Sequence, residues 1–363
     1  MKTKYLMITV TEACNLSCVY CYEKNKSAKS ISVDKAISLI EKELLADDGY
    51  ELCEITFHGG EPFMAFDAMK EICEYIWART WKIEYYFFVA TNGTKISSEA
   101  KAWLSEHRKQ FICGLSIDGN RIMQNINRNN SFDLIDLDFF VNNWPKQDVK
   151  VTISNHTLPM LADGLIFLHE KGFSIADNFA YGIDWSNPDN ASELVKQLNI
   201  LIEYYITHPD VQPSRLLSVK LEYLLADVND DRTCGIGSGM KVYDTEGNQY
   251  PCHYFEPVSV GQEASDAAKS IDFQNLKLYQ DPACKTCPIK TICPTCYGAN
   301  YAATGNISTR DKNMCALTWV SAYATAMLVY RKIETFGIES IHEDKKIQEA
   351  ILAGMLKLQQ LDP

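Results

Sequence analysis

Three cysteines stand within eight residues near the start of the chain, in the stretch CNLSCVYCYE at residues 14–23. Cys14, Cys18 and Cys21 follow an apolar run, Tyr5–Val10, that is typical of a β-strand. Three thiolates from one tight loop can hold three irons of a cubane cluster and leave the fourth iron open for a ligand. The alternatives are a zinc site, which needs four protein ligands when it is structural, and a redox dithiol, which leaves Cys14 unused.

The composition narrows the class of protein. The chain has 363 residues, of which 46% are hydrophobic and 23% charged, and this is typical of a folded protein. Its net charge of -12, with scattered Lys and Arg, disfavours nucleic acid as a partner. No apolar stretch approaches the ~20 residues of a membrane span, and no export signal is present, so we expect a cytoplasmic protein without a membrane partner. Thirteen cysteines in such a chain indicate metal or redox use rather than disulfides.

Residues 4 to about 185 alternate between short β-rich runs and helical stretches. The runs predicted as strands are Tyr5–Val10, Glu54–His58, Tyr85–Thr91, Ile112–Asp118, Val149–Asn155 and Asn178–Ile183. The predicted helices lie near 33–46, 64–79, 97–107, 132–143 and 161–171. Repeated β-α units favour a parallel sheet with outer helices, either an open wound sheet or a partial barrel. Functional residues are then expected at the carboxyl ends of the strands.

The rest of the chain changes character. Residues 186–231 contain an amphipathic stretch, Ala191–Ile206, and are predicted as a helical bridge. Residues 232–320 are rich in Cys, Gly and Pro with weak periodicity, as expected where metal sites replace a hydrophobic core. Residues 321–363 are predicted as the continuation of a long helix that frays into a polar tail. The predicted domains are therefore 1–185, 186–231, 232–320 and 321–363.

With its aromatic Tyr20 before the last cysteine, the loop at Cys14, Cys18 and Cys21 resembles the hallmark of the radical S-adenosylmethionine (SAM) superfamily. The resemblance extends over the first 185 residues and implies a partial (β/α)6 TIM-like barrel. It also implies that the open iron of a [4Fe-4S] cluster binds SAM. One electron from the cluster then cleaves SAM to methionine and a 5'-deoxyadenosyl radical, which abstracts a substrate hydrogen.

The same resemblance assigns residues to the cofactor. The stretch Gly59-Gly60-Glu61-Pro62 matches the family's GGEP motif, which holds the methionine amino group. Glycines let the backbone approach a ligand, and a carboxylate accepts hydrogen bonds from an ammonium. By similarity, the further cofactor-binding residues at or near strand ends are Tyr20, Asn92, Ser116, Arg128 and Asn155, and Asp118 is a candidate catalytic residue on the substrate side. The alternative for the Ser, Asn and Asp residues is a role in helix caps and turns.

A second group of cysteines lies between Cys234 and Cys315. Its members are Cys234, Cys252, Cys284, Cys287, Cys293, Cys296 and Cys315. A zinc ribbon also uses two CxxC pairs, but it separates them by ~15 to 20 residues. Here only five residues separate Cys287 from Cys293, which favours neighbouring clusters.

This spacing, with Gly247 before Cys252, resembles the SPASM domain, a cysteine-rich extension that holds two auxiliary [4Fe-4S] clusters. The resemblance implies that Cys284, Cys287, Cys293 and Cys315 ligate an outer cluster. Cys234, Cys252 and Cys296 would ligate an inner cluster, which is left one ligand short. Cys293 and Cys296 are separated by two residues where the family usually has three. Cys53, Cys73 and Cys113 are interpreted as ordinary buried cysteines.

SPASM enzymes of this architecture mostly modify peptides and proteins. The resemblance therefore implies a maturase of a ribosomally made precursor peptide that installs a thioether or carbon-carbon crosslink. Formylglycine formation, as in anaerobic sulfatase maturases, and peptide epimerisation are alternatives. Those maturases use an aspartate as base directly after the second cysteine of this domain, where this chain has His253, a candidate catalytic residue. A noncatalytic iron-sulfur electron carrier is the alternative from another class.

The expected partners follow from this interpretation. They are the precursor peptide, an electron donor such as flavodoxin or ferredoxin, and a separate leader-binding protein, because the first strand starts too early for a leader-binding domain to precede it.

Overall fold

The computed structural model describes residues 2–226, 232 and 234–361. The end of the predicted helical bridge, 227–231, and residues 362–363 of the predicted tail lie outside the described residues. The chain divides into two compact units that interleave along the sequence. The first comprises Met1–Ile117, Arg128–Lys150 and Cys234–Asn275, and the second comprises Asp118–Asn127, Val151–Thr233 and Leu276–Pro363. The predicted domain boundaries stay a prediction.

The first unit is built on a six-stranded sheet in the order β4-β3-β2-β1-β7-β8. The strands are β1 (Thr3–Thr11), β2 (Leu52–Gly59), β3 (Glu84–Thr91), β4 (Phe111–Leu115), β7 (Met240–Tyr243) and β8 (Gln249–Tyr250). All neighbours pair in parallel except β7 and β8, which are antiparallel. Beyond β4, the isolated parallel bridge between Ser116 and Lys150 continues the pairing to the start of β5 (Val149–Ile153).

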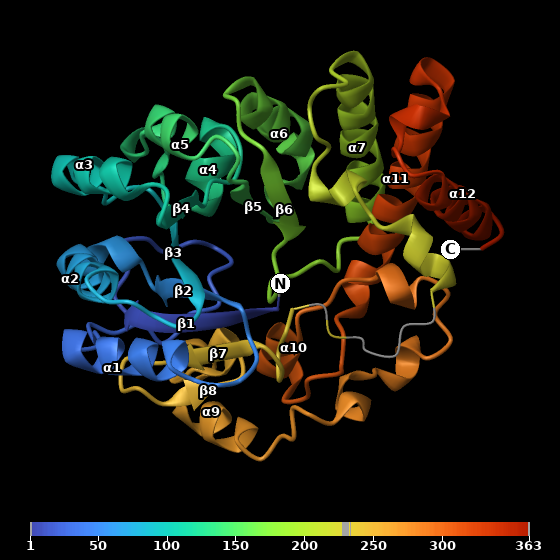
Figure 1. Cartoon of the computed structure of the whole chain (residues 1–363). Helices are drawn as coiled ribbons and strands as arrows, with labels where there is room; N and C mark the ends of the chain where they lie inside the picture. The colour runs from blue at the N-terminus through green and yellow to red at the C-terminus, as the bar shows by residue number, and fades with distance from the viewer. Residues whose placement is uncertain (1, 227–231, 233, 362–363) are drawn as a thin grey trace. The chain divides into compact units, whose positions relative to one another are not determined.

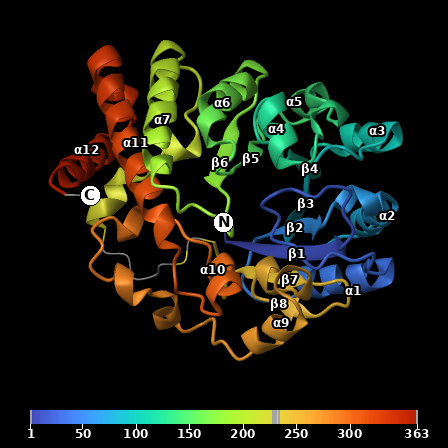
Figure 2. The same ribbon diagram turned by 180° about the vertical axis from the view of Figure 1, so that it is seen from behind.

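Helices cover one side of this sheet. Figures 1 and 2 show α1 (Val33–Leu44), α2 (Phe66–Trp77) and α3 (Ser98–His107) along the same side of β1–β3. α1 and α3 begin where Ser32 and Ser97 accept hydrogen bonds from backbone N–H groups of the first turn. Ile40 of α1 and Ile72 of α2 are fully buried with Ile55 of β2. This apolar core fixes the strands whose carboxyl ends carry the predicted site residues. The other helices of the unit are α5 (Leu137–Asn143), α8 (Pro257–Val260) and α9 (Gln262–Ala268).

The second unit combines a two-stranded sheet with longer helices. β5 pairs with β6 (Ile175–Phe179), and the helices are α4 (Arg121–Asn127), α6 (Leu161–Glu170), α7 (Asp189–Thr207), α10 (Tyr297–Thr304), α11 (Cys315–Phe336) and α12 (Lys345–Gln359). α6, α7 and α11 stand side by side in both views (Figures 1 and 2). The cysteine-rich segment after residue 276 contains short 3₁₀ helices at Pro282–Cys284, Lys290–Ile292 and Lys312–Met314.

The structure confirms most of the predicted elements. The first five strands lie where the sequence predicts them, and the sixth begins three residues early, at Ile175. The prediction of a fraying tail is wrong, because residues 345–359 form α12, whose first turn is capped by Asp344. Its periodic apolar residues pack on the buried cluster around Leu221, Ala322 and Leu358. The short helix α4 was not predicted.

Two further predictions concern the cysteines and the membrane. None of the thirteen cysteines, all in the described part of the chain, forms a disulfide. Cys53, Cys73 and Cys113 are at most 1% exposed, which confirms their interpretation as buried cysteines, and burial raises the pKa of each thiol. Among the described residues, no helix combines the length and apolar character needed to cross a membrane.

Candidate functional site

The loop after β1 presents Cys14, Cys18 and Cys21 in one tight turn. The N–H of Leu16 donates to Cys14 Sγ at 3.4 Å, and the N–H of Cys21 donates to the Cys18 carbonyl at 3.1 Å. Burial raises the pKa of Cys14. Lys26 lies beside two of the sulfurs: although burial opposes its charge, Cys21 and Cys14 raise its pKa overall. A backbone donor and a cation directed at the sulfurs suit an anionic metal-thiolate group.

The GGEP stretch holds the start of this loop by backbone contacts. The Gly60 N–H donates to the Thr11 carbonyl at 3.0 Å, and the Glu61 N–H donates to the Ala13 carbonyl at 2.8 Å. A Cβ on Gly59, whose φ is 143°, would lie 2.0 Å from Thr11 O, and a Cβ on Gly60 would lie 2.4 Å from Ala13 O. Only glycine lets the two backbones approach so closely. The motif and the cysteine loop are therefore one local structure.

The Glu61 carboxylate is buried and bound by its own protein. Its Oε1 accepts hydrogen bonds from the Thr91 hydroxyl at 2.6 Å and the Phe63 N–H at 3.1 Å, and its Oε2 accepts one from the Asn92 N–H at 2.8 Å. Burial raises its pKa, which these hydrogen bonds and Arg128 oppose. With three internal donors, the carboxylate orders the ends of β2 and β3. The contact of this motif with a cofactor stays a prediction.

Two other predicted residues border the cysteine loop. The Asn92 amide donates to Asn15 Oδ1 at 3.1 Å, so the end of β3 is tied to a residue between Cys14 and Cys18. The Arg128 guanidinium lies 5.5 Å from the centre of the Tyr20 ring, within cation-π range. Arg128 and Tyr20 thus belong to the surroundings of the loop, as the sequence predicts, and their contact with a cofactor stays a prediction.

Ser116, Asp118 and Asn155 have local roles. The Ser116 N–H donates to the Thr91 carbonyl at 2.8 Å at the end of β4, in the first unit. In the second unit, the fully buried Asp118 accepts hydrogen bonds from the Thr152 N–H at 2.9 Å and the Asn127 amide at 3.1 Å. The Asn155 amide donates to the Asp184 carbonyl at 3.0 Å. Both Asp118 oxygens have protein partners, which matches the structural alternative that the sequence left open.

His253 lies in a group of aromatic and acidic residues that the sequence did not single out. Its ring centre is 5.0 Å from that of His58 and 5.3 Å from that of Tyr22. Tyr22 stacks on Tyr254 at 4.3 Å, and its hydroxyl lies 3.3 Å from His58 Nε2. His58 Nε2 is also 3.3 Å from Glu23 Oε1. Burial lowers the pKa of His253 to about 4, so the imidazole is neutral near pH 7 and its protonated form is disfavoured.

Part of this group could have been found from sequence. Tyr22 and Glu23 directly follow Cys21, and His58 directly precedes the GGEP motif. Their position beside two strong motifs was the signal. The approach of His253 depends instead on the pairing of β7 with β1, which brings residues 240–243 beside residues 5–8.

The segment that follows Cys252 packs on the cysteine loop. The Asn25 N–H donates to the Val258 carbonyl at 2.9 Å. The Thr9 hydroxyl lies 2.9 Å from both carboxylate oxygens of Glu256. Burial raises the pKa of Glu256 to about 7. Cys252, which the SPASM resemblance assigns to the inner cluster, therefore precedes by a few residues Glu256 and Val258, which are hydrogen bonded to residues on either side of the three-cysteine loop.

In the second unit, the four cysteines of the predicted outer cluster gather on one segment. The sulfurs of Cys293, Cys284 and Cys287 all interact electrostatically with Cys315, the first residue of α11. Arg310 and Lys312 carry positive charge beside them: Lys312 Nζ lies 3.2 Å from Cys284 Sγ, and Arg310 Nε is buried without a hydrogen-bond partner among the described residues. An anionic cluster with sulfide acceptors fits this cationic surrounding.

The remaining cysteines give no complete ligand set. Cys234 and Cys252 belong to the first unit and Cys296 to the second. Cys296 Sγ accepts a hydrogen bond from the Ala299 N–H at 3.4 Å and caps α10. Within the described residues, no three Cys, His, Asp or Glu side chains are close enough together to bind a single metal ion. The three cluster ligand sets therefore stay predictions.

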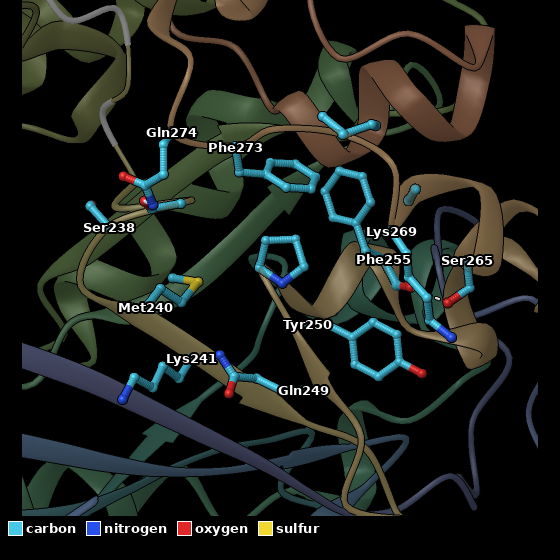
Figure 3. A pocket seen from close by; sticks show the side chains of 14 residues that line it. Ser238, Met240, Lys241, Gln249, Tyr250, Phe255, Ser265, Lys269, Phe273 and Gln274 are labelled. Atoms are coloured by element: carbon cyan, nitrogen blue, oxygen red, sulfur yellow. Dashed lines mark hydrogen bonds between the residues drawn. The ribbon is translucent and has the colours of Figure 1, made fainter. Parts of the chain in front are cut away.

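A pocket of about 380 Å³ lies elsewhere in the first unit, beside β7, β8 and α9 (Figure 3). The rings of Phe255 and Phe273 meet edge to face in its wall, with centres 5.1 Å apart. Lys241 and Lys269 lie on its border, each paired with a carboxylate, of Glu43 and Asp266, at 2.6 Å. None of the predicted site residues lines this pocket.

Comparison with known proteins identifies the first part of the chain. Residues 8–135 match the family model of the Radical SAM superfamily. A cysteine-type anaerobic sulfatase-maturating enzyme of Clostridium perfringens is 32% identical over 132 residues, which are 34% of this chain and 35% of that enzyme. The antilisterial bacteriocin subtilosin biosynthesis protein AlbA of Bacillus subtilis is 32% identical over 111 residues, 30% of this chain and 23% of AlbA. The matches thus span well under two thirds of either relative.

Solved structures show the same fold over a larger share of the chain. A His-tagged anSMEcpe with bound AdoMet aligns with a TM-score of 0.69 at 19% identity, covering 97% of this chain and 98% of that one. SuiB of Streptococcus suis, bound to its precursor peptide SuiA, aligns with a TM-score of 0.57 at 16% identity, covering 86% and 76%. With the parallel β-α units described above, these likenesses confirm the predicted fold class.

Proposed function

The chain carries a radical SAM domain at residues 8–135, and we propose that it is a maturase that modifies a ribosomally synthesised precursor peptide. The proposed modification is a thioether or carbon-carbon crosslink. Domains of this family bind a [4Fe-4S] cluster and SAM, which together supply a 5'-deoxyadenosyl radical able to abstract a hydrogen atom from unactivated carbon. The two auxiliary clusters at the later cysteines are part of the proposal.

One observation carries the proposal: the backbone of Gly59-Gly60-Glu61 is joined to the start of the three-cysteine loop. Two hydrogen bonds, from Gly60 to Thr11 and from Glu61 to Ala13, place the motif beside Cys14. A protein that only stores or carries electrons needs no ligand site next to its cluster. Under this proposal, a small molecule bound at the joined motif would meet a metal with an open coordination position on the adjacent loop.

The chain's own residues have defined tasks under this proposal. Cys14, Cys18 and Cys21 hold the cluster, and Lys26 offsets its negative charge. The glycines let the motif's backbone pack against Thr11 and Ala13 at the start of the cysteine loop, while Glu61 orders the ends of β2 and β3. Arg128 beside Tyr20 is suited to a carboxylate through its planar guanidinium.

Sulfatase-type formylglycine formation is the second candidate, favoured by the relative from Clostridium perfringens and by the placement of His253. The His253 ring lies close to His58 and Tyr22, and under this candidate function it would take a proton from a substrate thiol or hydroxyl, against the burial that lowers its pKa. A noncatalytic electron carrier is the candidate from another class, and epimerisation of a peptide residue is a third outcome of the same radical chemistry.

The proposed partners are a precursor peptide, which SuiB is seen to bind in its own structure, and a low-potential electron donor such as flavodoxin or ferredoxin. A separate leader-binding protein would complete the system. A cytoplasmic location is part of the proposal and is supported by the thirteen cysteines, since the cytoplasm keeps thiols free of disulfides.

The first experiment tests for SAM cleavage. The protein is reconstituted without oxygen, reduced, given SAM and analysed for methionine and 5'-deoxyadenosine. We expect both products from the native chain and neither from a variant with Cys14, Cys18 and Cys21 replaced by alanine. A native sample that holds about twelve irons per chain but releases no product favours the electron carrier instead.

The second experiment identifies the modification. A short peptide encoded next to this chain is coexpressed with it and examined by tandem mass spectrometry. Loss of two hydrogens with fragments that stay joined indicates a crosslink, and an aldehyde at one Ser or Cys indicates formylglycine. An unchanged mass with a D-residue after hydrolysis indicates epimerisation, and either of the last two results replaces the crosslinking proposal.

A further inference from the structure

Lys312 bridges a cysteine of the proposed outer cluster and a buried carboxylate. Its Nζ donates to Cys284 Sγ at 3.2 Å and to Asp281 Oδ2 at 2.7 Å. The Lys312 side chain is 48% exposed, whereas that of Asp281 is only 7% exposed. The ammonium therefore lies at the edge of the site, held in contact with one sulfur rather than free in solvent.

Asp281 is fixed as the partner that orients this ammonium. Its Oδ1 accepts a hydrogen bond from the Ala283 N–H at 2.8 Å, and its Oδ2 accepts one from the Arg310 N–H at 3.1 Å. Burial would raise the pKa of Asp281, but the bonds from Lys312 and the two N–H groups outweigh it and lower the pKa to about 2. The carboxylate is thus ionised and accepts hydrogen bonds from two backbone N–H groups as well as from Lys312, which it holds beside Cys284.

A second cation reinforces the positive charge of this site. Arg310 donates through Nη1 to the Cys293 carbonyl at 3.4 Å, and its buried Nε has no hydrogen-bond partner among the described residues. Between Cys284 and Cys315 the chain has four cations, at 285, 290, 310 and 312, and one carboxylate, at 311. This contrasts with the net charge of -12 of the whole chain.

Charge and hydrogen bonding at the sulfurs set the potential of an iron-sulfur cluster. Adding an electron makes a four-thiolate cluster more negative, so a nearby cation and an N–H···S bond stabilise the reduced form more than the oxidised form. The Lys312 ammonium supplies both the positive charge and the N–H···S hydrogen bond, because it carries a full charge and donates to Cys284.

We propose that Lys312, oriented by Asp281, is a positioning residue that raises the reduction potential of the cluster held by Cys284, Cys287, Cys293 and Cys315. This inference rests on the proposed function, since it requires that these four cysteines hold a [4Fe-4S] cluster. It adds a role for a residue that is neither a ligand nor part of the sequence motifs.

The test compares three variants at this position with a matched control. K312M removes the charge and the donor, K312Q keeps a donor without the charge, and K312R keeps both. K285M removes a lysine next to the same cysteine, one that is exposed and makes no hydrogen bond or ion pair with Asp281. The fully reconstituted proteins are titrated with reductant, and the midpoint potentials of the clusters are followed by electron paramagnetic resonance together with the iron content.

We expect one midpoint potential of K312M to shift to more negative values, while the other potentials and the iron content stay as in the native chain. K312R should retain the native potentials, and K285M should shift them less than K312M does. If K312M binds less iron than the native chain, K312Q is measured instead, and we again expect a shift of one midpoint potential to more negative values. Unchanged potentials in fully loaded K312M or K312Q, or an equal shift in K285M, overturn the inference. If the native chain binds no iron at these four cysteines, both this inference and the proposed auxiliary cluster are wrong. The iron content of the native chain therefore distinguishes a failure of the inference alone from a failure of the proposed cluster.

Discussion

The Thr91 hydroxyl donates a hydrogen bond to Glu61 Oε1 at 2.6 Å and so joins the end of β3 to the loop that follows β2. The same loop is hydrogen bonded to the start of the three-cysteine loop through the Glu61 N–H and the Ala13 carbonyl. Glu61 is thus the common anchor of three neighbouring strand ends. Its side chain is hydrogen bonded to the end of β3, and its backbone is hydrogen bonded to the start of the cysteine loop.

Replacing Glu61 by Gln tests this anchoring role. The new amide nitrogen would face either the Asn92 N–H or the Phe63 N–H, and a buried donor would lose its acceptor. We expect a loss of unfolding free energy of about 1 to 3 kcal/mol, measured by denaturant titration of the anaerobic protein. The E71Q variant, at an exposed position of α2, serves as control and should change stability by less than about 0.5 kcal/mol. Equal stability of E61Q and E71Q would contradict the anchoring role.

Replacing Gly60 by Ala should displace the cysteine loop. The added Cβ would lie 2.4 Å from Ala13 O and 2.8 Å from Cys14 Cβ, and neither neighbour is a flexible side-chain end. We expect the variant to lose about four irons per chain and to stop cleaving SAM, measured by iron analysis and product detection. G239A is the matched control, because its Cβ would meet nothing nearer than 3.5 Å. Full iron loading of G60A would show that the loop tolerates the displacement.

Much of the first unit could be predicted because its signals are local. β1 alternates buried Leu6, Ile8 and Val10 with residues of the other face, and a serine begins each of α1 and α3. The pairing of β7 with β1 and of β8 with β7 could not be predicted, because β7 and β8 are only four and two residues long. In addition, β7 lies more than 200 residues from β1 in the sequence. Such short segments carry no periodicity that distinguishes a strand from a loop.

The candidate site likewise has a part that could be predicted from the sequence and a part that could not. The motif residues around Cys14 and Gly60 come from neighbouring strand ends, and the structure brings these two motifs together, as the alternating pattern implies. The internal hydrogen bonds of Asp118 and the group around His253 depend on side-chain packing that spacing alone does not specify. Lys312 belongs to no motif, and only its distance to Cys284 distinguishes it from other exposed lysines.

Removing Cys315 should empty the proposed outer site while leaving the first cluster in place. Cys315 is exposed at the start of α11, and its sulfur interacts with three other cysteines of the site. We expect C315A to lose up to about four irons per chain and to keep the SAM-binding cluster, as judged by iron analysis and by SAM cleavage without substrate. C73A should keep all iron, because Cys73 is buried in α2 and belongs to none of the predicted ligand sets. Equal iron in C315A and the native chain would exclude Cys315 as a ligand.

A buried charge network joins β7 to α1 and should be important for stability. Glu43 Oε2 lies 2.6 Å from Lys241 Nζ and 3.9 Å from Lys4 Nζ, and its Oε1 accepts a hydrogen bond from Tyr243 at 3.0 Å. Glu43→Leu leaves the nearly buried Lys4 without this carboxylate, so we expect a loss of about 3 kcal/mol in unfolding free energy. E99Q breaks an exposed pair with Lys70 and should cost less than about 1 kcal/mol. A small effect of E43L would show that Asp48, 2.9 Å from Lys4, compensates.

The stability of the chain should also depend on pH through Glu256, which is 1% exposed. Burial raises its pKa from 4.5 to about 7, so between these values the folded protein binds more protons than the unfolded chain. The stabilisation from this group is therefore complete below pH 4.5 and is lost as the pH rises through about 7. In its protonated form Glu256 can pair with the Thr9 hydroxyl without a buried charge.

We expect the unfolding free energy of the native chain to fall by on the order of 2 kcal/mol from pH 5 to pH 8, with part of this slope absent in E256Q. The side-chain amide that E256Q introduces stays uncharged over the whole range and keeps an acceptor for Thr9, so this variant should exceed the native chain in stability at pH 8. Denaturant titrations at several pH values measure the two slopes. E263Q, at an exposed position of α9, is the control and should follow the native chain. Parallel slopes for E256Q and the native chain would mean that Glu256 is ionised in the folded protein throughout this range.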